Sequence, residues 1–463
     1  MRYLSTRGLD APRTFGAVVL DGLARDGGLY VPEDYPDVTA ELDKWSELSY
    51  QDLAVEVMTP FVAPDLSPET LRQLVTRAYR RFDHAEVTPL ASLSECDILE
   101  LFHGPTLAFK DVALQFLGEL FSELLHRQGR RMTIIGATSG DTGSAAIEGV
   151  RGRKGISIFM LHPKGRVSRV QALQMTTVLD DNVYNLAVSG DFDDCQGLVK
   201  SLFNDHAFRD RYSLGAVNSI NWARILAQTV YYFYAGLKRL RQRPNTPLTF
   251  VVPTGNFGDI LAGYIARRMG LPVAKLVIAT NHNDILVRVL RTGAYVPEQT
   301  RPSLSPAMDI QVSSNFERVL FDVAQRDGAK VREWMMGLNA GGFQLGDSEL
   351  TQLREIFEAV RVDDEEIIAT IRETYAQDRY VLDPHTAVGV TAAKKLGIKD
   401  AVCLATAHPA KFPEAVERAI GSPPPTPERI RTLFDLPTRQ YDLPASVNAL
   451  KTFIAEALEE SRK

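Results

Sequence analysis

The sequence predicts an α/β protein built around a parallel sheet with crossover helices. Short runs rich in β-branched residues alternate with helical patterns, and each run ends in a loop of Gly, Ser, Thr, Asn or Pro. These runs are MTIIGAT (132–138), GISIFML (155–161), LTFVVPT (248–254), KLVIATN (275–281) and AVCLAT (401–406). Because ligands bind at the carboxyl ends of parallel strands, we expect a site among the loops that follow these runs.

The chain has 463 residues, which is long enough for two or three domains. Residues 1–90 mix short helical patterns with Pro and Gly turns, so we expect an N-terminal helical subdomain there. We expect a small α/β domain over 91–220 and a large α/β domain over 221–463. The large domain would end in a helical tail after the turn-rich segment 421–430.

A long helix is expected from Trp222 to about Arg241 (WARILAQTVYYFYAGLKRLR). Its aromatic stripe of Tyr231, Tyr232 and Tyr234 is more typical of core packing than of a cofactor site. The helix is therefore expected to pack against the rest of the chain.

Composition narrows the class of protein. The chain is 45% hydrophobic and 24% charged with a net charge of −6, which fits a globular enzyme and argues against a nucleic-acid partner. It contains no apolar run of about 18 residues, so no membrane partner is expected. The three cysteines, Cys96, Cys195 and Cys403, are far apart and odd in number, and the histidines lack metal-binding companions. We therefore expect a cytoplasmic protein without a metal site.

Lys110 stands in the stretch HGPTLAFKDVALQF (103–116), between the apolar strand ILELF (98–102) and an amphipathic helix. A lysine beside an apolar floor loses hydration, which favours the neutral amine that can attack a carbonyl group. The alternative is a lysine whose stem lies along the helix start while its ammonium group stays in water.

The loop ATSGDTGSAA (137–146) follows a predicted strand and opens a helix. Its small residues let a ligand approach the backbone, and the unpaired amides of a helix start suit a carboxylate or a phosphate. An ordinary capped helix, with Ser139 or Asp141 as the N-cap, is a compatible interpretation.

The loop PTGNFGDILAG (253–263) has the same strand–turn–helix form. It offers the backbone donors of a phosphate cradle, but it lacks both the GKS/T of a nucleotide loop and the GxGxxG of a dinucleotide fold. The phosphate of a smaller cofactor is therefore favoured. The cradle residues are Gly255, Asn256, Phe257, Gly258 and Asp259.

A third loop, ATAHPAKFPEA (405–415), begins where Thr406 ends a strand. Its hydroxyl can face a ring beneath it, although such a residue is often only a turn former. An amine nucleophile, a phosphate cradle, an anion-holding helix start and a hydroxyl donor are together the parts that hold pyridoxal 5′-phosphate.

Several long motifs make the chain resemble the threonine synthase family, in particular its longer bacterial and fungal form. They occur in the family's order from about residue 100 to 415. The motifs are HGPTLAFKDVALQF, ATSGDTGSAA, NSINWARILAQ (218–228), VPTGNFGD (252–259), ATNHNDIL (279–286), MDIQVSSNFERVLF (308–321) and ATAHPAKFPE (405–414).

The resemblance implies the fold of the tryptophan synthase β-subunit family, which is fold type II of the pyridoxal-phosphate enzymes. It also implies a carbon–oxygen lyase acting on phosphates, which converts O-phospho-L-homoserine and water to L-threonine and phosphate at the end of threonine biosynthesis. Resemblance to the longer form favours a monomer.

The resemblance also implies roles for particular residues. Lys110 matches the catalytic Schiff-base lysine, the loop 255–259 matches the one that holds the cofactor phosphate, and Thr406 would face the pyridine nitrogen. A threonine at that position brings no charge to the ring nitrogen. The residues expected to receive the substrate carboxylate are Ser139, Gly140, Asp141 and Thr142. Many relatives have Asn at position 141, so that contact does not transfer and Asp141 is expected to cap the helix instead.

Asn218, Ser219 and Arg224 match positions that meet the substrate's phosphate. The planar fork of Arg224 suits a dianion, and the alternative is a surface arginine on the helix 222–241. Two rival functions remain open at this point. One is a phospho-lyase that gives 2-oxobutyrate from the same substrate, and the other is a non-catalytic homologue that binds phosphate esters.

Overall fold

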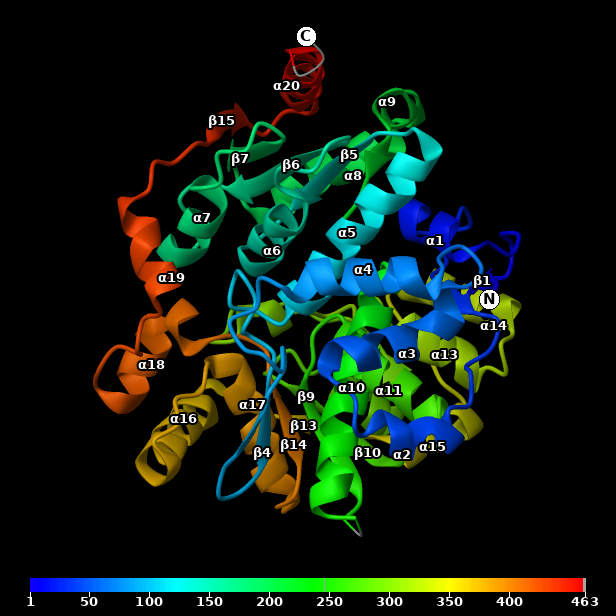
Figure 1. The fold of residues 1–463 in the computed structure, drawn as a ribbon, viewed down its shortest axis with the longest axis vertical. Helices are drawn as coiled ribbons and strands as arrows, with labels where there is room; N and C mark the ends of the chain where they lie inside the picture. Colours follow the sequence, from blue (N-terminus) through cyan, green and yellow to red (C-terminus); the bar gives the residue numbers. More distant parts are fainter. Residues whose placement is uncertain (245, 461–463) are drawn as a thin grey trace. The chain divides into compact units, whose positions relative to one another are not determined.

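The computed structural model describes residues 1–244 and 246–460. The chain forms two compact units, many of whose helices and strands are labelled in Figure 1. The large unit contains 1–76, 82–103 and 219–425, and the small unit contains 77–81, 104–218 and 426–463.

A six-stranded sheet in the order β13-β10-β9-β14-β4-β3 forms the centre of the large unit. Neighbouring strands are parallel except for β3 and β4, which are antiparallel. The strands are β3 (Leu90–Ser92), β4 (Asp97–Glu100), β9 (Leu248–Pro253), β10 (Val273–Thr280), β13 (Phe357–Arg361) and β14 (Val402–Ala405). Three of the runs predicted as strands, at 248–254, 275–281 and 401–406, are thus neighbours in this sheet.

Helices cover both faces of this sheet. The longer ones are α3 (Tyr50–Val62), α4 (Pro68–Tyr79, whose last residues belong to the small unit), α10 (Trp222–Gln242), α11 (Gly258–Arg268), α14 (Gly328–Asn339), α15 (Asp347–Ile356), α16 (Asp364–Asp378) and α17 (Pro384–Leu396). Short elements complete the unit: β1 (Tyr3–Ser5), α1 (Phe15–Asp21), β2 (Tyr30–Pro32), α2 (Leu42–Trp45), α12 (Ile285–Thr292), β11 (Ala294–Tyr295), α13 (Phe316–Val323), β12 (Phe343–Gln344) and α18 (Pro413–Ile420).

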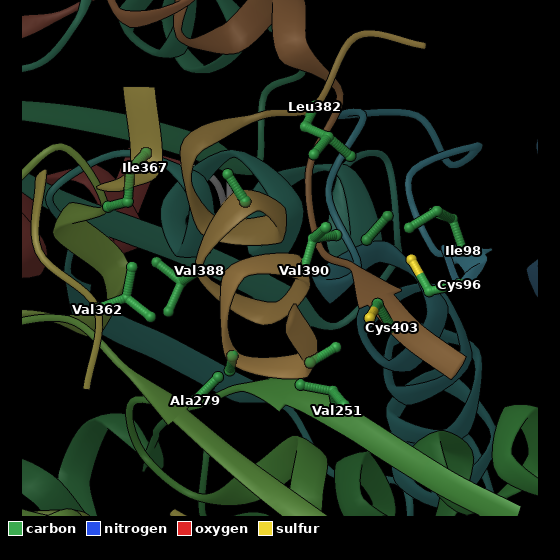
Figure 2. Packing of buried hydrophobic residues seen from close by; sticks show 14 of the residues in the cluster. Cys96, Ile98, Val251, Ala279, Val362, Ile367, Leu382, Val388, Val390 and Cys403 are labelled. Carbon is green, nitrogen blue, oxygen red and sulfur yellow. The ribbon is translucent and has the colours of Figure 1, made fainter. Parts of the chain in front are cut away.

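Adjacent residues of β9 show how the two faces are filled. Val251 lies in the apolar cluster beneath α17, together with Val388 and Cys403 (Figure 2). Phe250 points to the opposite face, where its ring centroid is 4.9 Å from that of Tyr232 in α10. The strand is therefore buried on both sides, which explains why its sequence is a continuous apolar run.

The N-terminal segment packs on α10 within the large unit. Trp222 Nε1 donates a hydrogen bond of 3.1 Å to Tyr3 Oη, which in turn donates one of 2.9 Å to the carbonyl of Phe61. The rings of Tyr50 and Tyr234 meet edge to face with centroids 5.3 Å apart. The aromatic stripe of α10 thus packs as core, as its spacing predicts.

The small unit contains a parallel sheet in the order β15-β7-β6-β5-β8. Its strands are β5 (Met132–Ala137), β6 (Ile156–Pro163), β7 (Val183–Ser189), β8 (Leu214–Gly215) and β15 (Tyr441–Pro444). Its helices are α5 (Lys110–Gln128), α6 (Asp141–Val150), α7 (Arg169–Thr176), α8 (Phe192–Asn204), α9 (His206–Tyr212), α19 (Glu428–Arg431) and α20 (Val447–Glu460). Phe159 of β6 shares one core cluster with Leu198 of α8 and Ile454 of α20.

The bounds of the two units differ from the division expected from the sequence. Residues 1–76 belong to the large unit, and 426–463 belong to the small unit, whereas the sequence pattern groups this tail with 221–463. The tail joins the small unit because β15 extends its sheet beside β7 and α20 packs in its core. No helix among the described residues is both long and apolar enough to cross a bilayer.

Helices α5 and α6 pack closely where Gly118 meets Gly149, and this contact should contribute to the stability of the fold. A Cβ atom on Gly118 would stand 1.8 Å from the carbonyl oxygen of Gly149, so Gly118→Ala should lower the free energy of unfolding by about 3 kcal/mol. The matched change Gly197→Ala, on α8 with no atom within 4 Å, should raise it by about 0.5–1 kcal/mol. Urea denaturation of both variants measures these effects, and equal stability of the two variants would contradict the predicted packing.

Candidate active site

Lys110 is the first residue of α5 and is only 9% exposed. Its Nζ lies 4.8 Å from the centre of the Phe109 ring. The side chain is therefore buried beside an apolar surface, as expected for a reactive lysine, and does not extend into bulk water. A helix start also places backbone amides next to this amine.

The loop before Lys110 is folded back onto α5 by Asp111. The backbone N–H and the hydroxyl of Thr106 donate to the two carboxylate oxygens of Asp111 at 2.7 and 2.8 Å. Gly104 has no room for a side chain, because a Cβ atom there would stand 2.3 Å from Asp111 Cβ. The turn at 104–106 thus fixes the chain that leads into Lys110.

Helix α7 supports two loops of the small unit. Gln174 Nε2 donates to the carbonyl of Thr106 at 2.9 Å, and Gln171 Nε2 donates to Asp141 Oδ1 at 2.7 Å. The loop of Lys110 and the predicted carboxylate loop are therefore held by the same helix. Sequence reasoning missed both glutamines, because nothing in the pattern of α7 distinguishes them from surface residues.

The N-cap of α6 is not one of the two residues, Ser139 and Asp141, that the sequence suggests for this position. The N-cap is Gly140, at a φ of 148°, and neither Ser139 nor Asp141 caps the helix. Thr138 takes that role, because its Oγ1 accepts from the amides of Gly140 and Gly143 at 2.9 Å each. The carboxylate of Asp141 instead accepts the amide of Gln171. Ser139 is exposed and Thr142 is half-buried, so the four residues 139–142 lie together at an accessible helix start.

The predicted phosphate cradle lies between β9 and α11 in the large unit. Phe257 is the N-cap of α11 at a φ of 64°, and Gly258 is the first helical residue. Ser313 Oγ donates to the carbonyl of Gly255 at 2.7 Å, and Asn315 Nδ2 donates to that of Asn256 at 3.0 Å. Two carbonyls of the cradle thus accept hydrogen bonds from one segment, 313–315. The first amides of a helix have no intrahelical partners, so those at the start of α11 are suited to an anion.

Asp259 takes part in the cradle in a different way from its neighbours. Its Oδ1 accepts hydrogen bonds from Tyr231 at 2.5 Å and from Tyr232 at 3.1 Å. Burial, with a further contribution from Asp259, raises the pKa of both phenols well above the ordinary value, so they remain donors at neutral pH. The carboxylate is held by α10, so the backbone amide of Asp259 is the group that would be available to an anion at the helix start.

Thr406 follows β14 directly and is buried. Because β14 pairs in parallel with β9, Thr406 and the cradle leave the same edge of the sheet of the large unit. The structure thus brings together a hydroxyl and an anion-binding loop that are about 150 residues apart in the sequence.

Arg224 lies in the first turn of α10 and is 4% exposed. Its Nε and Nη1 are buried and have no hydrogen-bond partner among the described residues. Burial lowers the pKa of the guanidinium to about 10, so it stays charged at neutral pH. The surface-arginine alternative is therefore wrong. A buried cation with unused donors is suited to an anionic ligand.

Ser219 and Asn218 precede α10. The carbonyl of Ser219 accepts from Asn315 Nδ2 at 3.1 Å and lies 3.7 Å from the position of a Cβ atom on Gly258, so Ser219 is adjacent to the cradle. Asn218 is assigned to the small unit, and its Oδ1 is buried without a hydrogen-bond partner among the described residues.

The residues present fit pyridoxal 5′-phosphate. Within the small unit there are a buried lysine and an accessible helix start. Within the large unit there are a glycine-rich cradle, a hydroxyl at the same sheet edge and a buried cation. Where Gly255 stands, a Cβ atom would be 2.7 Å from the carbonyl of Ala307, so the cradle is built for glycine. A lysine for the aldehyde and a cradle for the phosphate are the requirements of this cofactor.

Comparison with known proteins gives a consistent result. Three family models match: the threonine synthase N terminus over residues 2–79, the pyridoxal-phosphate dependent enzyme over 84–406 and the threonine synthase C-terminal model over 386–454. The threonine synthase of Pseudomonas aeruginosa is 49% identical over 98% of each chain. That of Saccharomyces cerevisiae is 47% identical over 90% of this chain and 89% of its own.

The solved structures that resemble this chain include threonine synthases as well. A crystal structure of threonine synthase from Brucella melitensis with bound pyridoxal phosphate has a TM-score of 0.96 at 47% identity and covers 99% of both chains. Threonine synthase from Escherichia coli has a TM-score of 0.83 at 33% identity, over 98% of this chain and 100% of that one. The expected fold type II of the pyridoxal-phosphate enzymes is confirmed, the cofactor is pyridoxal 5′-phosphate, and the chain belongs to the threonine synthase family.

Proposed function

We propose that this threonine synthase converts O-phospho-L-homoserine and water to L-threonine and phosphate, the last step of threonine biosynthesis. The observation that carries the choice of substrate is the buried guanidinium of Arg224, whose Nε and Nη1 are unpaired among the described residues. A phosphate dianion supplies the charge and the acceptors that this group lacks. An unphosphorylated hydroxy amino acid would leave the buried cation uncompensated.

The cofactor would be held by three sets of residues. Lys110 Nζ binds its aldehyde, the amides of 255–259 bind its phosphate and Thr406 donates to or accepts from its pyridine nitrogen. When bound, the cofactor withdraws electrons from the substrate's carbon atoms. Because Thr406 is a neutral hydroxyl, it orients the ring without fixing a proton on the nitrogen as a carboxylate would.

Lys110 also moves protons. Once the substrate's amino group replaces it, Nζ is free to accept the proton from the substrate's α-carbon and then one from the β-carbon, which lets phosphate leave from the γ-carbon. The γ-carbon is then protonated, water adds its oxygen at the β-carbon, and a proton returns to the α-carbon. Asp111 and Thr106 keep the amine near this position because they fold the preceding loop onto α5. The side chain is only 9% exposed, so the amine is largely removed from bulk water.

The substrate would be held at both ends. Its carboxylate binds the helix start at 139–142, where Gln171 fixes Asp141 so that the acidic side chain is held by α7. Its phosphate binds Arg224, Ser219 and Asn218. Two anionic groups on one small molecule thus select a substrate of fixed length.

Replacement of Lys110 tests the covalent role. Lys110→Ala should lose all measurable turnover, and borohydride reduction followed by mass spectrometry should find no cofactor attached to the chain. The exposed lysine of the control Lys154→Ala should leave turnover and attachment unchanged. Retained turnover in Lys110→Ala, or attachment at another lysine of the wild type, would refute the assignment.

Replacement of Arg224 separates binding from stability. Arg224→Met should raise the KM for O-phosphohomoserine by on the order of 100-fold, with little change in cofactor affinity. The same change should raise the free energy of unfolding of the ligand-free protein by about 1 kcal/mol or more, because it removes an uncompensated buried charge.

The control for this experiment is Arg241→Met, at the exposed end of the same helix, where Arg241 forms an ion pair with Glu47. That variant should have a KM within about twofold of the wild-type value and a free energy of unfolding within about 0.5 kcal/mol of it. Destabilisation of Arg224→Met with an unchanged KM would show that Arg224 is structural.

Analysis of the products distinguishes the two possible outcomes of the chemistry. With O-phosphohomoserine as substrate, we expect one threonine for each phosphate released. Chromatography and a coupled assay for 2-oxo acids measure both. Formation of 2-oxobutyrate and ammonia in place of threonine would identify a phospho-lyase.

A further inference from the structure

The segment MDIQVSSNFERVLF (308–321) lies behind the phosphate cradle and has no role in the mechanism above. It contains Ser313 and Asn315, whose side chains donate hydrogen bonds to the carbonyls of Gly255 and Asn256 in the cradle. In addition, Ala307 and Met308 pack against Gly255, at 2.7 and 3.5 Å from the position of a Cβ atom there. The segment is thus the support on which the cradle rests within the large unit.

Asn315 is the centre of this support and is fully buried. Its backbone N–H donates to the carbonyl of Asn256 at 3.1 Å, and its Nδ2 donates to the same oxygen at 3.0 Å. The same Nδ2 donates to the carbonyl of Ser219 at 3.1 Å. One amide group therefore joins the cofactor-phosphate loop to the segment that precedes Arg224.

Arg318 fixes the orientation of that amide. Its Nη1 donates to Asn315 Oδ1, its Nη2 donates to the carbonyl of Ile220 at 2.7 Å and its Nε donates to the carbonyl of Tyr30 at 2.8 Å. Because Arg318 is a donor only, Asn315 must present its oxygen to Arg318 and its nitrogen to the two carbonyls. Burial lowers the pKa of Arg318 to about 10, so it remains a cation at neutral pH.

We propose that Asn315, oriented by Arg318, is a positioning residue that holds the cofactor-phosphate loop and the substrate-phosphate segment at a fixed separation. The proposal rests on the function proposed above, in which 255–259 binds the cofactor's phosphate and Ser219 and Arg224 bind the substrate's. Amides can converge on an anion only if the carbonyls of the same peptides are satisfied on the other side. Asn315 satisfies one carbonyl from each of the two anion-binding segments.

Ser313 gives an internal comparison because it touches only one of these segments. Its hydroxyl donates to the carbonyl of Gly255, and its backbone N–H donates to Tyr295 Oη at 2.8 Å. Loss of the Ser313 hydroxyl should therefore disturb cofactor binding alone. Loss of the Asn315 amide should disturb the binding of both phosphates.

Asn315→Asp is the sharpest test, because Asp has the same shape and still accepts from Arg318, but its side chain cannot donate to either carbonyl and places a carboxylate oxygen against both. The backbone N–H at this position still donates to the carbonyl of Asn256. We expect the dissociation constant of pyridoxal phosphate, titrated into the apoenzyme, to rise about tenfold. We expect the KM for O-phosphohomoserine, measured at saturating cofactor, to rise by a similar factor. Asn315→Ser removes the same donor without adding a charge and replaces the first variant if that one does not fold.

Ser313→Ala should raise the dissociation constant of the cofactor about fivefold and leave the KM within twofold of the wild type. The matched control is Asn182→Asp, because Asn182 Nδ2 also donates to two carbonyls, those of Val150 and Ile156, at 2.9 Å each. This control should lower the melting temperature while both binding constants stay unchanged.

Three results would overturn the inference: unchanged binding constants in both Asn315 variants, a rise in only one of the two constants, or equal effects of Asn182→Asp. Failure of the proposed function is distinguishable, because the wild type would then not turn over O-phosphohomoserine. The titration of the apoenzyme with cofactor would still report on the support of the cradle.

Discussion

A loop that binds an anion with its backbone amides must be kept in shape by hydrogen bonds to its other groups. This constraint determines how the proposed site is built. A backbone amide is available to a ligand only where no cap of the loop itself occupies it, so the bonds that keep the loop in shape must come from elsewhere. In the small unit Gln171 provides such a bond to Asp141, whereas Thr138, a residue of the loop itself, occupies the amides of Gly140 and Gly143. In the large unit Ser313 and Asn315 provide these bonds. Under the proposed function, the loops that bind ligands would depend on residues that do not themselves contact the ligand.

Arg224 combines burial with unsatisfied hydrogen-bond donors among the described residues. Arg224 is a buried cation with no ion-pair partner among the described residues. Two other large buried arginines have partners: Arg239 forms ion pairs with Asp97 and Asp400, although its Nη1 lacks a hydrogen bond, and Arg318 donates to backbone carbonyls. The contrast indicates that burial alone does not explain Arg224. The binding of a phosphate dianion, as proposed above, would offset the cost of desolvating this cation.

Much of the fold could be predicted from the sequence because the strands of a parallel sheet are buried on both faces and read as continuous apolar runs. Five such runs were visible, and all are strands. Strand β13 was missed because it follows α15 without a turn residue, and β15 because Pro444 and its half-exposed positions break the pattern. The return of the tail to the small unit depends on strand pairing that no local pattern records.

Candidate site residues could be chosen from the sequence where the residue type itself suggests the chemistry, as with Lys110 and the glycines at 255 and 258. The supporting residues Gln171, Gln174 and Asn315 could not be, because their roles arise from tertiary contacts. The most direct measurement is a crystal structure with pyridoxal phosphate and a phosphonate analogue of O-phosphohomoserine. We expect the cofactor's phosphate on the amides of 255–259 and the phosphonate on the guanidinium of Arg224. A cofactor phosphate bound elsewhere, or a phosphonate that leaves Arg224 without an anionic partner, would contradict the account.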